Sequence, residues 1–515
     1  MSARGEAVRN TLFSSVGLYT EYGLGVLTSI IIARELEPAG YGVYAAIVWL
    51  AGLGIAATNS GTASAAIKFI AELRGAGRLD LLGTLVHYLR RIEHLFYLAI
   101  MLIGALVFWR HGADYSGGLD PWLVFALIAV AVGLRAPYMF DIGVCKGFEN
   151  FGATARIAAV AAPCNLALML AAWLLHLPVL GFLLAYVLSG VVFRLMSHRE
   201  VARMLAPLGV QGELSRDLMR RILRHVRISA TTVTVTFLSA RDVEVMFLTR
   251  YASAADAGFY KIAYQLATGA ALLAPGVFSA ILLPLMANAL SRGGDVAANR
   301  FVASTSYLFL LAAPLMAFGV LFSGDVILLF YGEAFAAAIP ALTVLILACC
   351  IGSLNAGGAS LLISADRQHN ILFVTLGIGA LKLVLDWWLI RAHGLSGAVV
   401  AATISGLIGT CVVLMLAMHS MRVALDWRRL ARIVLAGCAG GVAAWLVPHG
   451  LSPLLRLMFG GSLLVLVYAV ATVLFGCWSR GDLVYLRGLH AHLPWLPGSR
   501  MFEWAERRAR LEEER

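Results

Sequence analysis

The chain contains 515 residues, of which 60% are hydrophobic and only 13% charged, and its mean hydropathy is +0.84. This composition excludes a soluble globular protein, because apolar stretches of about 20 residues, each long enough to cross a bilayer as a helix, recur along the sequence. The formal net charge of +11 does not indicate nucleic-acid binding, because the basic residues gather on alternate connections between those stretches. The charge instead reports the orientation of the chain in a membrane and its contact with anionic lipid.

We predict an all-α polytopic membrane protein with about 14 transmembrane helices and both termini in the cytoplasm, because backbone polar groups in lipid must pair within helices. The predicted spans are residues 10–33, 41–67, 90–109, 121–143, 153–175, 178–197, 227–249, 257–286, 303–323, 335–363, 370–390, 395–418, 430–447 and 456–477. Most Lys and Arg residues then lie on the cytoplasmic side, which is the positive-inside pattern. The periplasmic side receives Arg34, Arg110, Arg250, Arg391 and Arg456.

The sequence contains an internal repeat at a shift of 216 residues. The matched positions lie at equivalent points of the predicted spans: Arg34 and Arg250, Gly42 and Gly258, Tyr44 and Tyr260, Ser189 and Ser405, Gly190 and Gly406. Each repeat holds six spans, so the two copies enter the membrane from the same side, as parallel repeats of transporters do. We therefore predict an N-lobe over 1–215, a C-lobe over 216–425, a final helix pair over 426–478 and a cytoplasmic tail over 479–515.

Short motifs in these segments resemble one family of membrane transporters. They are Ile31-Ile32-Ala33-Arg34-Glu35-Leu36 with Gly40-Tyr41-Gly42-Val43-Tyr44, Phe330-Tyr331-Gly332-Glu333-Ala334-Phe335, Ser364-Ala365-Asp366-Arg367, and His393-Gly394-Leu395-Ser396-Gly397-Ala398. Together with Asn10 in the first span, they resemble the multidrug/oligosaccharidyl-lipid/polysaccharide exporter superfamily. Within it, the chain is most similar to the polysaccharide-repeat flippases of the Wzx kind.

This resemblance implies two six-helix bundles around a central cavity, and it implies a function. Members move an undecaprenyl-pyrophosphate-linked oligosaccharide from the cytoplasmic to the periplasmic leaflet of the bacterial inner membrane, for O-antigen, capsule or exopolysaccharide synthesis. The implied partners are this lipid-linked substrate, the bilayer, a polysaccharide polymerase and a chain-length regulator. We expect no enzymatic activity and no bound cofactor. Since no GxxxxGK[ST] motif occurs, an H+ or Na+ gradient or the removal of product would supply the energy.

Ionisable residues inside the predicted spans are the candidates for transport, because each costs about 2.5–3.5 kcal/mol to insert and therefore faces protein or water. Arg241 and Lys261 are predicted to bind the pyrophosphate. A guanidinium fits phosphate oxygens, and the resemblance places the helices that open the C-lobe at the cavity. In a continuous helix Arg241 shares a face with Glu244, while Asp242 is turned about 100° away. The alternatives are that Glu244 or Asp242 neutralises Arg241 in packing, and that Lys261 reaches to the membrane interface.

Five residues are predicted to line the cavity or couple transport to an ion: Glu21, Asp242, Glu244, Lys382 and Asp386. Glu21 has no basic neighbour one turn away and fits a proton or cation site, or a partner for Arg241 across the cavity. Lys382 and Asp386 are four residues apart, which is the spacing of an intrahelical ion pair, and contact with the ligand is the alternative.

Arg135, Asp141, Asn59 and Pro275 are predicted to act in gating. Arg135 precedes Pro137 at an expected kink, while Asn59 and Pro275 interrupt the corresponding second and eighth spans. Paired irregularities in equivalent helices point to the moving parts of a transporter, although small residues also serve close helix packing. No group of Cys and His residues has metal-binding spacing, so we predict no metal site.

Two other functions fit parts of the sequence. A cation-coupled drug or small-molecule antiporter of the same superfamily would have acidic and aromatic cavity residues rather than basic ones. A membrane glycosyltransferase or polymerase would need a long periplasmic loop or a catalytic carboxylate, and every predicted periplasmic connection is short.

Overall fold

The computed structural model is almost entirely helical over the residues that it describes, which are 3–207, 212–240, 242–272, 277–448 and 450–478. Side chains are described over the same ranges except at 3–21, 60, 238–240 and 277–281. Within these ranges no β-strand occurs. The predicted all-α fold class is confirmed.

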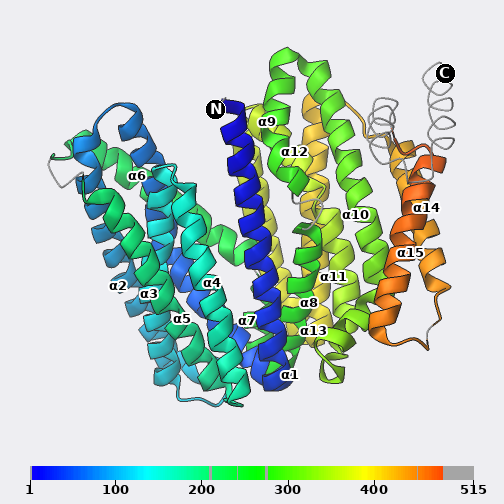
Figure 1. Ribbon diagram of the computed structural model, residues 1–515, viewed down its shortest axis with the longest axis horizontal. Helices are drawn as coiled ribbons and strands as arrows, with labels where there is room; N and C mark the ends of the chain where they lie inside the picture. The colour runs from blue at the N-terminus through cyan, green and yellow to red at the C-terminus, as the bar shows by residue number, and fades with distance from the viewer. Residues whose placement is uncertain (1–2, 208–211, 241, 273–276, 449, 479–515) are drawn as a thin grey trace. The chain divides into compact units, whose positions relative to one another are not determined.

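Helices follow one another along the chain, joined by short turns (Figure 1). The α-helices are α1 (Ala3–Gly75), α2 (Leu82–Tyr115), α3 (Pro121–Gly147), α4 (Phe151–Leu174), α5 (Val179–Leu205), α6 (Arg216–Ala240), α7 (Glu244–Tyr251), α8 (Ala254–Ala271), α9 (Val277–Arg292), α10 (Gly294–Phe330), α11 (Ala338–Gly352), α12 (Asn355–Ser364), α13 (Gln368–Met421), α14 (Trp427–Trp445) and α15 (Pro453–Leu474). In the described part of the chain, the 3₁₀ helices η1 (Leu79–Leu81) and η3 (Glu333–Phe335) lie between them.

Several helices begin where the sequence supplies a capping side chain. The Asp120 carboxylate accepts a hydrogen bond from the Leu123 amide at 2.8 Å, and Pro121 occupies the first helical position of α3. The Asn150 side chain accepts from the Ala153 amide at 3.0 Å at the start of α4. These bonds satisfy backbone amides that the first turn of a helix leaves without partners.

Among the described residues, nine helical stretches are long and apolar enough to cross a membrane. Two of them, within α1 and α13, have 54 residues each and could cross twice, since about 20 residues suffice for one crossing. The backbone breaks in both: α1 at Glu37, with φ 55° and ψ 176° before Pro38, and α13 at Gly394, with φ 55° and ψ −128°. Each of these two stretches is therefore long enough for two crossings, and each breaks between them.

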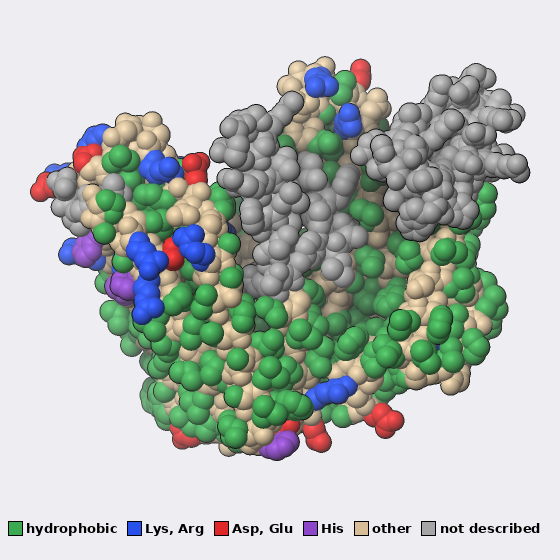
Figure 2. All heavy atoms as spheres, viewed as in Figure 1, with side chains coloured by type: hydrophobic (Ala, Val, Ile, Leu, Met, Phe, Trp, Pro, Cys, Tyr) green, Lys and Arg blue, Asp and Glu red, His purple; other side chains and the backbone are tan. Residues whose placement is uncertain are grey.

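The exposed surface of the helices is apolar. On α2, the side chains of Leu98, Leu102 and Leu106 follow one another at a spacing of four residues and are 62%, 66% and 56% exposed. On the visible face, hydrophobic side chains cover the middle of the helices and charged ones gather toward their ends (Figure 2). A band of exposed apolar side chains of this kind contacts lipid, so the protein is a multi-pass membrane protein.

The chain forms two compact units. Unit 1 comprises Met1–Ile262 and Thr375–Ala401, and unit 2 comprises Ala263–Val374 and Ala402–Arg515. In unit 1 the core includes Phe69, Leu85, Phe140 and Ile157, contributed by α1 to α4. The core of unit 2 is built largely by α9, α10, α12 and the end of α13, with Met286, Phe301, Leu308, Leu361 and Ala417 among its members. The predicted lobe boundaries stay a prediction.

Helix ends recur at the shift of 216 residues. The paired ends, first copy and second copy, are Gly75 and Arg292, Tyr115 and Phe330, Gly147 and Ser364, Leu205 and Met421, each within one residue of the shift. The turn glycines Gly77 and Gly293, also related by the shift, both adopt positive φ, 72° and 133°. Such a repeated set of helix bounds supports the internal repeat that the sequence indicates.

Candidate functional site

Charged side chains from three helices come together in unit 1. Asp242 lies two residues before Glu244, the first residue of α7, and Lys261 lies on α8. Lys382 and Asp386 lie on the part of α13 that belongs to unit 1. We call these five residues the charge cluster. All five are residues that the sequence predicts for binding or coupling.

A break between α6 and α7 shapes the charge cluster. α6 ends at Ala240, α7 begins at Glu244, and Asp242 has a positive φ of 22°, a conformation that Asp tolerates better than most residues. The predicted continuous span over 227–249 is therefore wrong at this point. In an unbroken helix, Asp242 and Glu244 would point about 200° apart, whereas here both carboxylates pair with lysines of the cluster. Interrupted helices are where transporters hold substrates and ions.

Two lysine–carboxylate pairs hold the cluster together. Lys382 Nζ lies 2.9 Å from Glu244 Oε1, and both side chains are buried, 8% and 0% exposed. Lys261 forms an ion pair with Asp242, and its side chain is 29% exposed. Lys382 thus pairs with a carboxylate on another helix, so the expected intrahelical pair with Asp386 is wrong. Of the two lysines, Lys261 is the one whose side chain reaches an accessible surface.

Asp386 is the carboxylate of the cluster that lacks a cation of its own. Its side chain is fully buried, and neither of its oxygens has a hydrogen-bond partner in the part of the chain that the structure describes. Counted over the described residues, the cluster holds three carboxylates and two lysines. A buried carboxylate without a partner is costly, and it is relieved by a proton, a cation or a positively charged ligand.

Two of the predicted gating residues, Arg135 and Asn59, form hydrogen bonds to neighbouring helices in unit 1. The Arg135 guanidinium donates to Ser189 Oγ at 2.7 Å and to the Tyr186 carbonyl at 3.2 Å, and it lies 4.0 Å from the Tyr186 ring centroid. Asn59 Nδ2 donates to the carbonyl of Ala136 at 3.1 Å, which connects α1 to α3. Their role in gating stays a prediction.

Three predicted site residues lie outside what the structure describes. Arg241 and Pro275 are outside the described residues, and Glu21 lies in α1 with a side chain that is outside them. Among the described residues, no group of three or more metal-binding side chains comes together.

A second charged network in unit 1 was missed by sequence reasoning. The buried Asp141 of α3 accepts from Arg90 of α2 and from Arg194 of α5, each at 2.6 Å, and from Ser197 at 2.9 Å. Glu93, one turn after Arg90, is also buried. Asp141 stands out in the sequence as an acid inside a span, but nothing in the sequence identifies its two arginine partners. We call Asp141, Arg90, Arg194 and Ser197 the three-helix clamp.

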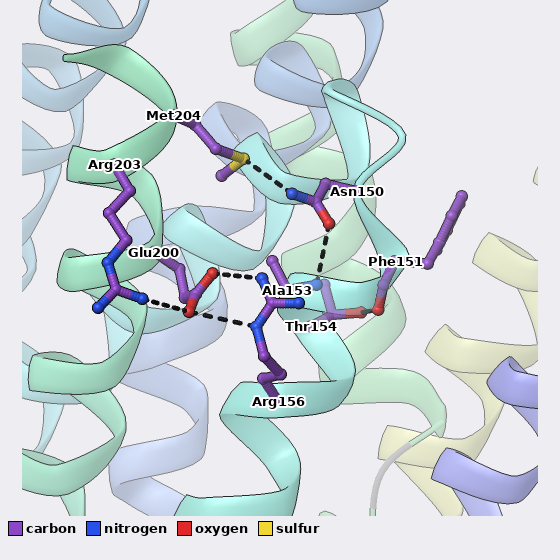
Figure 3. Close-up of polar contacts among 8 residues, drawn as sticks. All are labelled: Asn150, Phe151, Ala153, Thr154, Arg156, Glu200, Arg203 and Met204. Atoms are coloured by element: carbon purple, nitrogen blue, oxygen red, sulfur yellow. Dashed lines mark hydrogen bonds and ion pairs between the residues drawn. The ribbon is translucent and has the colours of Figure 1, made fainter.

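An exposed network of charged side chains connects the start of α4 to the end of α5. The Glu200 carboxylate accepts from Arg156 at 2.6 Å and lies 3.4 Å from Arg203 (Figure 3). In the same view Asn150, which caps α4, donates to the sulfur of Met204 at 3.5 Å. These contacts tie α4 to α5 outside the apolar core.

Comparison with known proteins gives one family match and several structural matches. The profile of a family described as "Polysaccharide biosynthesis protein" matches residues 7–290, more than half of the chain. No match was found among curated protein sequences.

The structural matches include a lipid II flippase and multidrug resistance transporters. The chain is similar to the lipid II flippase MurJ in an inward closed conformation, with a TM-score of 0.72, 13% identity, and coverage of 92% of this chain and 99% of that one. It is also similar to a MATE-family multidrug resistance transporter of the MOP superfamily. In the inward-facing conformation of that transporter the TM-score is 0.63 at 16% identity, covering 78% of this chain and 94% of the other. In the outward-facing conformation it is 0.55 at 16% identity, covering 81% and 95%. At these identities the matches show a shared fold, and they agree with the resemblance drawn from the sequence motifs.

Proposed function

Since the chain belongs to the polysaccharide biosynthesis protein family, we propose that it is a flippase for lipid-linked oligosaccharides. It would move an undecaprenyl-pyrophosphate-linked repeat unit from the cytoplasmic to the periplasmic leaflet of a bacterial inner membrane, with both termini in the cytoplasm. The product would serve O-antigen, capsule or exopolysaccharide synthesis, where a polymerase and a chain-length regulator would take it up. The fold shared with a lipid II flippase supports a substrate of this class.

The observation that carries the proposal is the ion pair between Lys261 and Asp242. Lys261 is partly exposed, whereas Asp242 is nearly buried, so a ligand can approach the ammonium group from the side away from its carboxylate. A pyrophosphate carries more negative charge than one carboxylate and would compete for the same ammonium. Arg241, next to Asp242 in the sequence, would add a guanidinium to the same binding site.

Coupling to an ion follows from the rest of the cluster. Glu244 pairs with the ammonium group of Lys382, and Asp386 has no hydrogen-bond partner among the described residues. Uptake of one H+ or Na+ at these carboxylates would balance the cluster, and its loss would change the charge next to the pyrophosphate. Transport would then proceed by alternating access, driven by the gradient of that ion.

A cation-coupled drug antiporter is the second candidate. The buried, unpaired carboxylate of Asp386 favours it, because a cationic drug could replace the coupling ion there. The likeness to MATE transporters is compatible with this reading.

Reconstituted vesicles separate the two functions. We expect wild-type protein to flip a fluorescent polyprenyl-pyrophosphate oligosaccharide, and we expect Lys261→Ala to abolish flipping while Lys261→Arg retains it, because only the latter keeps a cation for the phosphates. Arg241→Ala should abolish surface polysaccharide in cells while the protein remains in the membrane. Normal flipping by Lys261→Ala, or efflux of a cationic dye without any flipping, would overturn the assignment.

A further inference from the structure

Two glycines that the internal repeat relates to each other meet in unit 1. A Cβ atom built on Gly42 of α1 would overlap the carbonyl oxygen of Ala254 and come within 3.0 Å of the Gly258 amide nitrogen. A Cβ built on Gly258 of α8 would overlap the carbonyl oxygen of Pro38 and come within 3.2 Å of the Gly42 amide nitrogen. Both positions therefore require glycine, because backbone lies directly against backbone there.

The two halves of this contact are equivalent. Gly42 and Gly258 are separated by the 216-residue shift, and so are Pro38 and Ala254. Gly42 of the first copy thus packs against Ala254 of the second, and Gly258 of the second copy packs in the same way against Pro38 of the first. This is the reciprocal pattern of an interface built on a two-fold axis, where one surface packs against its own equivalent. We call the contact of segments 38–42 and 254–258 the glycine crossing.

Backbone breaks lie immediately before both segments of the glycine crossing. α1 departs from helical geometry at Glu37, one residue before Pro38. α7 ends at Tyr251, and α8 begins at Ala254. Such breaks at helix ends are the positions that absorb large changes of φ and ψ when helices move. Each segment of the glycine crossing can therefore swing about its own break.

Side chains hold the same region together by contacts that are open to water. Arg250, at the end of α7, forms an ion pair with Asp114 near the end of α2, with side-chain exposures of 37% and 27%. The Arg391 guanidinium of α13 lies 4.4 Å from the ring centroid of Tyr251 and 4.7 Å from that of Trp387. Exposed pairs of this kind contribute little stability and exchange readily.

We propose that the glycine crossing is a gate that closes one end of the transport path, with the Arg250–Asp114 ion pair as its latch. The two segments of the glycine crossing separate when substrate leaves. They close again through backbone contact, without interlocking side chains that would have to repack. The predicted charge distribution places Arg34, Arg250 and Arg391 of this end in the periplasm, so the gate closes the exit side. This inference rests on the proposed transport function but not on the identity of the substrate.

Substitution of the glycines tests the gate, since a methyl group at either position prevents closure. Gly42→Ala and Gly258→Ala should each reduce transport by about tenfold or more, as expected when overpacking disfavours one of two states. The double substitution should be no worse than the stronger single one, because both break one contact. The matched control is Gly25→Ala, also in α1, where a Cβ would meet nothing within 4 Å. Membrane content and elution in detergent should match wild type in all four proteins.

Cross-linking tests the gate without relying on any glycine variant. In a full-length chain whose seven cysteines are replaced by serine or alanine, Asp114→Cys and Arg250→Cys are joined by a short reducible thiol linker. We expect transport to stop on cross-linking and to return on reduction. When Gly42→Ala is added, a water-soluble thiol reagent should label the chain that carries Arg250→Cys alone faster. In the chain with both Asp114→Cys and Arg250→Cys, cross-linking should fall.

The outcomes decide between a gate and a fixed contact. Transport that continues through the cross-linked protein, or additive losses for the two glycines, would show a static packing contact and overturn the proposal. Labelling and cross-linking require no substrate. If they behave as expected while oligosaccharide flipping is absent, the proposed substrate is wrong and the gate stands.

Discussion

The two copies of the internal repeat share several helix ends but not their charges. The charge cluster lies in the second copy and consists of Asp242, Glu244, Lys261, Lys382 and Asp386. The equivalent positions of the first copy hold, in the same order, Val26, Thr28, Ala45, Leu166 and Leu170. None of these residues is ionisable. The second copy thus places buried and half-buried charges where the first copy has uncharged side chains.

The three-helix clamp shows the opposite distribution. The equivalents of Arg90, Asp141 and Arg194 in the second copy are Ser306, Gly357 and Thr410. In the first copy two arginines bridge three helices through one buried carboxylate. We interpret α2, α3 and α5 of the first copy as a rigid bundle and the second copy as the one that changes charge during transport. The predictions below test this comparison, from the largest expected effect to the smallest.

Removing the buried cation of the charge cluster should have the largest effect. Lys382→Met leaves Glu244 and Asp386 buried without an ammonium group, and breaking such a pair costs about 3–5 kcal/mol. We expect a clearly lower melting temperature in detergent, with partial recovery when Glu244→Gln is added. The control is Leu166→Met at the equivalent position of the first copy, which should melt within a few degrees of wild type. Equal melting temperatures of Lys382→Met and wild type would show that the two copies do not differ in this way.

Neutralising the three-helix clamp should lower stability without changing the transport step. Asp141→Asn weakens two hydrogen bonds from charged groups, which are worth about 1.5–3 kcal/mol each, but Arg90 and Arg194 can turn toward water. We expect a moderately lower melting temperature and an unchanged flipping rate per folded molecule in vesicles. A lost flipping rate at unchanged stability would instead place the clamp in the transport machinery.

Removing the hydrogen bond between Asn59 of α1 and Ala136 of α3 should lower stability less. Asn59→Ala deletes the hydrogen bond to the Ala136 carbonyl, a change of about 1 kcal/mol. Asn59→Asp, which keeps the shape but not the Nδ2 donor, should be at least as destabilising. If Asn59 acts in gating, as the sequence suggests, both variants should also slow transport relative to their loss of stability.

Breaking the exposed charged network between α4 and α5 should change stability least. The Arg156 side chain is 59% exposed, and exposed ion pairs contribute about 0–1 kcal/mol. We expect Arg156→Ala to shift the melting temperature slightly at low salt and not at all at high salt, because salt screens the pair. A large shift that persists at high salt would show that the pair fixes the packing of the two helices.

Much of the fold can be predicted from the sequence, because lipid imposes simple rules on it. Apolar stretches of spanning length, basic residues on alternate connections and matched residues at one shift predict the helical class and the repeat. The helix break before Glu244 was not predicted, because Ala240, Asp242 and Val243 include neither glycine nor proline. The partner of Lys382 was also missed, since it depends on how α7 packs against α13, helices more than a hundred residues apart.

The reciprocal contact at the glycine crossing has a consequence for how such a chain could arise. Two separate, identical half-length proteins could form the same contact as a symmetric dimer. In that dimer any buried charge would appear twice, and each extra ionisable group in lipid costs about 2.5–3.5 kcal/mol. When the two halves are joined into one polypeptide, a charge no longer has to appear twice, because a substitution then alters one half only. Gene fusion would thus be the step that permits an ion-responsive centre in one half beside an inert scaffold in the other.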